Sequence, residues 1–97
     1  MINSRQRAYL RSLANKVPAR YQIGKGQIGE NTVEMLLEGL EANEIIKINV
    51  LENCLAEPRA ICDELVELTG AEPVAVIGRK IILYKESKNH KEIRLPK

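Results

Sequence analysis

The sequence predicts an α/β fold: a two-layer sandwich in which three helices pack on a mixed four-stranded sheet. Segments with hydrophobic residues at helical spacing alternate with segments in which every second residue is hydrophobic, in the order α-β-α-β-α-β-β. Helices between strands require crossover connections, so part of the sheet must be parallel. A length of 97 residues and a hydrophobic fraction of 44% suit one domain, residues 1–97.

The first helix is expected from residue 4 to about residue 16, with Ser4 as its N-cap and Pro18 ending the pattern. Its hydrophobic stripe consists of Leu10, Leu13, Ala14 and Val17. Residues 20–23 are then expected to form a short strand. That strand leads into a glycine-rich segment, Gly24-Lys25-Gly26-Gln27-Ile28-Gly29.

The second helix is expected to begin near residues 29–31, where Asn31 and Glu34 can form a capping box. Asn43 is expected to end it in a left-handed conformation. The hydrophobic stripe comprises Val33, Leu36, Leu37 and Leu40. Residues 45–51 alternate between hydrophobic and polar side chains, which predicts a half-buried strand.

The third helix is expected to start at Pro58, a residue that a first helical turn tolerates, and to stop at Gly70. Its stripe comprises Ile61, Leu65 and Leu68. Two strands follow, at residues 74–77 and 80–84. Gly78 and Arg79 between them suit a two-residue hairpin turn.

The distribution of charge along the chain is more informative than its total of +2. Residues 1–28 carry +6, residues 29–72 carry −9 and residues 73–97 carry +5. This segregation favours a polyanionic partner, with the acidic middle turned away from it. Alternatively, the basic and acidic segments pair with one another in the fold. Residues 86–97 are expected to form a basic C-terminal tail, loose or lying along a sheet edge.

The glycine-rich segment supports more than one interpretation. Gly24-x-Gly26-x-x-Gly29 follows a strand and opens a helix, so it formally matches a nucleotide-binding pattern. Against a dinucleotide cofactor, the preceding strand carries Arg20 and Gln22, and 97 residues are too few for the full fold. Glycine amides, a helix N-terminus and Lys25 together suit a phosphate group. The simplest alternative is that the glycines only permit a tight turn.

Other chemistry finds little support in the sequence. Cys54 and Cys62 are too few for a disulfide framework, and with the single His90 they lack the spacing of a zinc site. We find no catalytic constellation and expect neither enzymatic activity nor a cofactor. No hydrophobic run is long enough to span a membrane and the N-terminal residues lack a signal-peptide pattern, so a reduced, cytoplasmic protein is expected.

Five segments, taken in order, resemble the YhbY family, small bacterial proteins made of one CRM domain. They are residues 5–14, 23–31, 44–48, 76–84 and 93–96. The CRM domain is the RNA-binding module of chloroplast RNA splicing and ribosome maturation factors. The resemblance implies the fold of the C-terminal domain of a bacterial translation initiation factor. It also implies binding to structured RNA and association with precursors of the large ribosomal subunit. A separate hypothesis is a protein-interaction module on these precursors, in which the acidic helices contact basic ribosomal proteins.

The resemblance also implies a loop similar to the GxxG element of KH domains, which clamps nucleic-acid backbone. By position this loop corresponds to Gly24, Lys25, Gly26 and Gln27, with Gln27 where the family has its second glycine and Gly29 where it typically has threonine. Because Phe and Trp are absent, phosphate clamping is favoured over base stacking. The further residues expected to contact RNA are Arg5, Arg7, Arg11, Arg20, Tyr21, Arg79 and Lys80.

Overall fold

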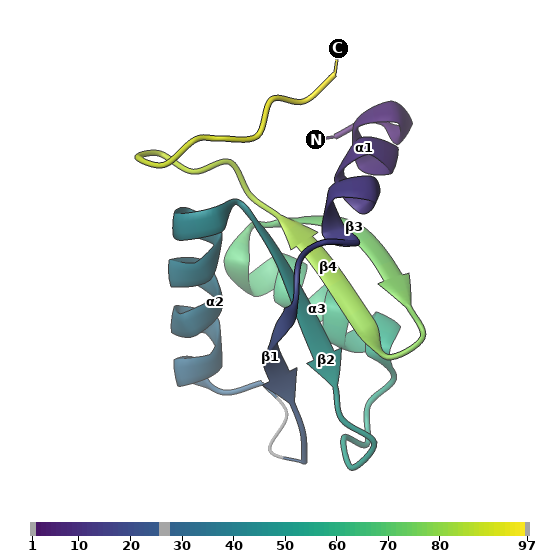
Figure 1. Ribbon diagram of the computed structural model, residues 1–97. Coiled ribbons are helices and arrows are strands. Elements are labelled where there is room, and N and C mark those ends of the chain that lie inside the picture. Colours follow the sequence, from purple (N-terminus) through teal and green to yellow (C-terminus); the bar gives the residue numbers. More distant parts are fainter. Residues whose placement is uncertain (1, 26–27, 97) are drawn as a thin grey trace.

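The computed structural model describes residues 2–25 and 28–96, and Figure 1 shows their arrangement. The order of elements is the one that the sequence predicts. The elements are α1 (Ser4–Ala14), β1 (Ala19–Ile23), α2 (Glu30–Asn43), β2 (Ile45–Val50), α3 (Pro58–Thr69), β3 (Glu72–Ile77) and β4 (Lys80–Tyr84). None of the described helices is long and hydrophobic enough to cross a membrane.

The four strands form one mixed sheet in the order β1-β2-β4-β3, which confirms the predicted sheet. β1 and β2 are parallel, and the other two pairs are antiparallel. Ile48 in β2 lies in register with Tyr21 on one side and Ile81 on the other. β3 is an edge strand, and its proline, Pro73, adjoins a shift in register, as is typical of an edge position.

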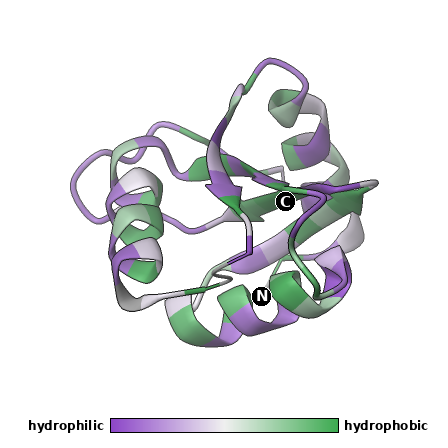
Figure 2. Cartoon of the chain, turned by 90° about the horizontal axis from the view of Figure 1, so that it is seen from below, coloured by the Kyte–Doolittle hydropathy of each residue, from purple (hydrophilic) through white to green (hydrophobic). Residues whose placement is uncertain are grey.

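The two faces of the sheet are covered unequally (Figure 1). α2 and α3 pack on one face, over a core that includes Ile46, Ile48 and Leu83. These two layers form the predicted sandwich. On the other face, α1 covers Ile45 and Tyr84, at the end of the sheet where β2 starts and β4 stops. The rest of this second face carries no helix, and we call it the open face. Figure 2 shows hydrophobic residues concentrated on the strands and on one side of each helix.

The first helix begins differently from the prediction. Its N-cap is Asn3 and not Ser4. The Asn3 side chain accepts a hydrogen bond from the Gln6 amide (2.8 Å), and the Gln6 side chain accepts one from the Asn3 amide (3.0 Å). This reciprocal capping box satisfies two amides at the helix start, whereas a cap at Ser4 would satisfy fewer.

The predicted start of α2 near residues 29–31 is confirmed, but the residues predicted to cap its two ends are wrong. Its N-cap is Gly29, whose amide donates to the Thr32 hydroxyl (3.3 Å), so no capping box forms between Asn31 and Glu34. The left-handed residue at its other end is Glu44 (φ 66°), one position after Asn43. Tertiary contacts of the Glu44 carboxylate hold this unusual conformation, which a non-glycine residue adopts only when its surroundings impose it.

The third helix and the hairpin agree with the sequence. Pro58 occupies the first turn of α3, and Gly70 caps its end in the left-handed conformation (φ 74°). Gly78 also has a positive φ (60°), as the predicted turn requires. One detail differs: the side chain of Leu68 is 49% exposed, and Thr69 is buried in its place.

The C-terminal segment is fixed to the fold, although it forms no helix or strand. The buried Glu44 carboxylate accepts three main-chain hydrogen bonds of 2.7–2.9 Å, from Ser87, Glu92 and Ile93. Glu41 accepts from the Ser87 hydroxyl (2.8 Å) and from two further amides. Ile93 and Leu95 pack on the core beneath α1. The segment is therefore not a loose tail.

These contacts change the acidity of both glutamates. Burial raises the pKa of Glu44, but hydrogen bonds from the Ile93, Ser87 and Glu92 amides outweigh it, and the pKa is lowered overall. Hydrogen bonds from Ser87 and the two amides that follow lower the pKa of Glu41 to about 2. Both carboxylates are therefore ionised at neutral pH while they hold the C-terminal segment.

Candidate nucleic-acid interface

Three loops meet at one end of the sheet, which we call the loop end (Figure 1). They are the glycine-rich loop (residues 24–29), the loop after β2 (residues 51–57) and the turn between β3 and β4. The Leu51 amide donates to the Ile23 carbonyl (2.8 Å), and the Val50 amide donates to the Arg79 carbonyl (2.7 Å). Because β1 and β2 are parallel, the loops that follow them leave the sheet on the same side.

Gly24 is needed for packing between two of these loops. A Cβ atom at this position would lie 3.1 Å from Asn53 Oδ1 and 3.2 Å from Leu51 Cδ1, which is too close for ordinary contact. A Cβ atom at Gly29 would meet nothing within 4 Å. Gly24 therefore has a role in packing against the loop after β2, and this role is compatible with a ligand at the exposed Lys25. Gly26 and Gln27 lie outside the described residues.

The N-terminus of α2 points toward the loop end. Its N-cap, Gly29, has no side chain that could accept a hydrogen bond from the first-turn amides. Such amides carry partial positive charge and bind anions readily. A phosphate group at this position would be held by main-chain donors and would lie close to Lys25.

At the hairpin, Arg79 and Lys80 have different surroundings. The Arg79 guanidinium donates to the main-chain carbonyls of Val50 (2.8 Å) and Leu51 (2.6 Å), so it fixes the end of β2. Lys80 is exposed and lies in register with Asn49 on the open face. Of the two, Lys80 has the side chain that is free to reach a ligand at the loop end.

The basic residues of α1 lie far from the glycine loop. α1 covers the start of β2, whereas the loop end is at its other end, about 20 Å away for a six-residue strand. Arg5 and Arg11 are exposed, and Arg7 is half-buried with its Nε donating to the Pro73 carbonyl (3.4 Å). The fold therefore does not bring these arginines together with Lys25.

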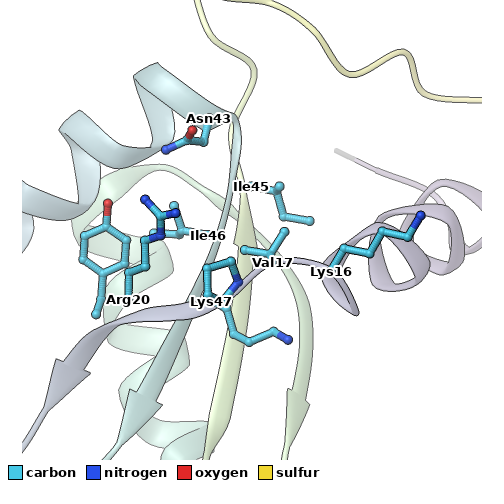
Figure 3. Close-up of a pocket in the computed structure, with 9 residues that line it drawn as sticks. Lys16, Val17, Arg20, Asn43, Ile45, Ile46 and Lys47 are labelled. Carbon is cyan, nitrogen blue, oxygen red and sulfur yellow. The ribbon is translucent and has the colours of Figure 1, made fainter.

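Arg20 and Tyr21 lie between these two regions, on β1. Tyr21 packs under α2, with its ring and hydroxyl against Gly39, so it faces the helix and not the glycine loop. Arg20 is exposed and lines a recess of about 240 Å³ at the start of β1 (Figure 3). Lys16 and Lys47 line the same recess.

The structure separates the charges of the molecule in space. The acidic residues of the middle segment lie mostly on α2 and α3, which cover one face of the sheet, whereas α1 and the open face carry basic residues. Among the side chains that the structure describes, no ion pair joins a basic residue of the N-terminal segment to an acidic residue of α2 or α3. Pairing with the acidic helices therefore does not explain the charge of the N-terminal segment, whereas Glu41 of the acidic middle does lie 3.7 Å from His90 of the C-terminal segment.

The fold therefore consists of a parallel β1-α2-β2 unit followed by α3 and a β-hairpin, and the sequence of this fold matches one family model. Residues 2–85 match the model of the CRS1/YhbY (CRM) domain. The chain belongs to the CRS1/YhbY family.

Relatives of this CRM domain span nearly its whole length. It is 40% identical over 96 residues to a protein of Bacillus subtilis named "Probable RNA-binding protein YqeI", covering 99% of this chain and 100% of that protein. It is 26% identical over 96 residues to a protein of Haemophilus influenzae named "RNA-binding protein", covering 99% and 96% of the two chains. A solution structure from Staphylococcus aureus has 44% identity and a TM-score of 0.83, over 99% of this chain and 100% of that one.

Sequence reasoning did not single out three side chains that border the candidate interface: Asn53, Leu55 and Lys47. Asn53 and Leu55 belong to the loop beside the glycine loop, and Leu55 is 88% exposed. Lys16 and Lys47 line the recess with Arg20. The parallel pairing of β1 and β2 was the available signal for the first two, because it places their following loops side by side.

The cysteines of the CRM domain are buried free thiols. Burial raises the pKa of Cys62, which keeps this thiol protonated at neutral pH. Among the residues that the structure describes, no group of three or more histidine, cysteine, aspartate or glutamate side chains is placed to hold a metal ion.

Proposed function

We propose that this CRM domain binds RNA and acts by binding, without catalysis, in the assembly of the large ribosomal subunit. The single observation that carries the proposal is the separation of charge: among the side chains that the structure describes, the basic residues of α1 and the open face, with Lys25, form no ion pair with an acidic residue of α2 or α3. Unpaired cations on one side of a domain favour a polyanion. The relatives' names identify that polyanion as RNA.

In this proposal the glycine loop and the start of α2 hold the RNA backbone. Main-chain amides of residues 24–27 and of the first turn of α2 bind phosphate oxygens, and Lys25 adds a positive charge. Lys80 extends the contact at the loop end, and Arg20 extends it along β1. Arg5, Arg7 and Arg11 meet a second stretch of the same RNA, because α1 lies at the other end of the sheet.

Salt dependence tests the RNA-binding part of the proposal. Each phosphate that a cation neutralises contributes about 0.7–0.9 to the slope of log affinity against log salt concentration. Electrophoretic mobility shifts with fragments of large-subunit ribosomal RNA at several salt concentrations measure this slope. Lys25→Gln is expected to lower the slope by about one.

Lys25→Glu and Lys88→Glu form a matched pair, because both reverse one exposed lysine. Lys88 lies on the C-terminal segment, where its amide donates to Glu41 at the far end of α2. The proposal expects a large loss of affinity only for Lys25→Glu. Equal losses would mean that overall charge alone determines binding, and the loop would then have no special role.

Sedimentation tests the ribosomal part of the proposal. In sucrose gradients of a bacterial lysate, the tagged native protein is expected to migrate with precursors of the large subunit. Lys25→Glu should move it to the top of the gradient and Lys88→Glu should not. If the native protein binds RNA in vitro but never migrates with large-subunit particles, the assembly role is wrong and RNA binding remains.

A further inference from the structure

The recess at the start of β1 has the composition of a site for a nucleobase. Its wall combines an aromatic ring and aliphatic side chains, from Tyr21, Ile45 and Ile46, with one amide, from Asn43. Three cations, Lys16, Arg20 and Lys47, complete the lining, and no acidic residue lines it. A base needs a hydrophobic surface and hydrogen-bonding groups, and the phosphate attached to it needs positive charge.

The polar groups of the recess are available to a ligand. The Asn43 amide nitrogen donates to the Gly39 carbonyl (3.3 Å), which fixes the side chain and leaves its oxygen as an acceptor. The side chains of Arg20, Lys16 and Lys47 make no hydrogen bond or ion pair within residues 2–25 and 28–96. Figure 3 shows Arg20 extending toward Asn43, whereas Lys16 and Lys47 extend away from these two.

The flank of α2 that borders β1 is neutral. Gly39 lies against Tyr21, and Asn43, one turn later, lines the recess. Met35, one turn before Gly39, is 51% exposed. Glu38 and Glu41 lie on another side of α2, because Glu41 is directed to the C-terminal segment and Glu38 is one turn from it on the helix. A phosphate backbone that follows β1 therefore meets no acidic side chain from this flank.

β1 connects the recess to the glycine loop. It is an edge strand of five residues, so its two ends lie about 15 Å apart. A KH-type loop holds about four nucleotides of backbone. A strand of RNA that leaves the glycine loop along the edge of β1 can therefore reach the recess within a few nucleotides.

We propose that the recess formed by Arg20, Tyr21, Asn43, Ile46 and Lys47 binds one unpaired base of the RNA strand that the glycine loop holds. The base lies against the partly exposed Tyr21, its edge meets Asn43 and Arg20, and Lys47 with Lys16 attracts the adjoining phosphate. This inference rests on the proposed function, since it requires RNA at the glycine loop. It adds recognition of a base to a contact otherwise limited to the backbone.

Fluorescence anisotropy with two RNA hairpins tests the recess. One hairpin carries a single-stranded extension of four nucleotides, and the other carries the same extension without bases. The native protein is expected to bind the abasic RNA about ten-fold more weakly. Asn43→Leu removes the acceptor and fills the recess, so it should weaken binding to the intact RNA about ten-fold and leave the abasic RNA unaffected. Glu38→Gln, on the acidic flank of α2, is the control.

Lys25→Glu separates failure of the recess from failure of the proposed function. If Lys25→Glu weakens binding to both RNAs while Asn43→Leu changes neither, the recess proposal is overturned and the loop proposal stands. If Asn43→Leu acts as expected and Lys25→Glu has no effect, the recess binds a base without RNA at the glycine loop, so the role of the loop and its connection to the recess are both wrong. Equal binding of both RNAs by the native protein also overturns the recess.

Photocrosslinking gives a second measurement that does not depend on a variant. A 4-thiouridine in the extension is expected to crosslink to peptides that contain residues 16–21 or 43–47. Crosslinks confined to α1 or to the loop end would place the extension elsewhere and overturn the proposal.

Discussion

Replacing Glu44 by glutamine should destabilise the protein strongly, although the side chain keeps its shape. In the native protein Glu44 Oε1 accepts from the amides of Glu92 (2.7 Å) and Ile93 (2.8 Å), and Oε2 accepts from that of Ser87 (2.9 Å). Glutamine can keep the first two bonds, but its NH₂ group would then face the Ser87 amide, so two donors would oppose each other. No water can reach this site, because Glu44 is fully buried.

The magnitude follows from these contacts. A hydrogen bond to a charged acceptor contributes about 1.5–3 kcal/mol, and the two retained bonds weaken when the charge is removed. Relief from burying a charge offsets part of this loss. We therefore expect the free energy of unfolding to fall by about 3 kcal/mol, which lowers the Tm of a domain of this size by at least about 10 °C.

Urea unfolding followed by circular dichroism at pH 7 measures the effect. Glu38→Gln, which also neutralises a glutamate of α2 but at an exposed position, is the control and should change stability by less than about 0.5 kcal/mol. Limited proteolysis should cut the C-terminal segment faster in Glu44→Gln. A stability within about 1 kcal/mol of the native value would refute the idea that the Glu44 carboxylate holds this segment.

Three further predictions follow from the packing. Gly39→Ala would place a Cβ atom 2.8 Å from Tyr21 Cζ, so it should lower the free energy of unfolding, measured by thermal melts, by about 1–3 kcal/mol. Adding Tyr21→Phe should restore part of this stability. An unchanged Tm in Gly39→Ala would contradict the packing of Tyr21 against Gly39. Arg79→Met removes two hydrogen bonds at the end of β2, so amide hydrogen exchange should accelerate in residues 51–54. Exchange at the native rate in these residues would show that Arg79 does not fix the end of β2. Because the pKa of Glu41 is lowered to about 2, its stabilisation is complete above the ordinary value of 4.5 and is lost as the pH falls toward 2. Between pH 6 and pH 2 the free energy of unfolding should therefore decline less in Glu41→Gln than in the native protein. Parallel pH curves for the two proteins would contradict a stabilising role of the Glu41 carboxylate.

Local patterns in the sequence were sufficient where the determining interactions are local. The helical spacing of the hydrophobic residues, the hairpin at Gly78 and the stop at Gly70 all follow from backbone geometry over a few residues. The helix caps predicted at Ser4 and Asn31 were wrong, because the position of a cap depends on individual side-chain contacts and not on the hydrophobic spacing. Each real cap depends on which neighbouring side chain satisfies an amide, as Gln6 does for Asn3.

The candidate site was only partly accessible from the sequence. The pattern around Gly24 and Lys25 located the loop end, because glycines before a helix indicate a close approach of the backbone. It did not reveal that the loop after β2 lies against Gly24, nor that Arg79 is occupied by main-chain carbonyls. Such contacts join residues far apart in the chain, and no local pattern specifies them.

The sequence by itself determined the order of the elements, the mixed sheet and the segregation of charge, since these depend on the spacing of residue types along the chain. Only the tertiary structure decided how the charged segments lie relative to one another. It placed α1 on the face opposite α2 and α3, and it separated the arginines of α1 from Lys25 by the length of the sheet. It also buried Glu44 against the C-terminal segment. The physical reason is that the face of the sheet on which each helix packs depends on the handedness of its connection and on contacts between residues far apart in the chain.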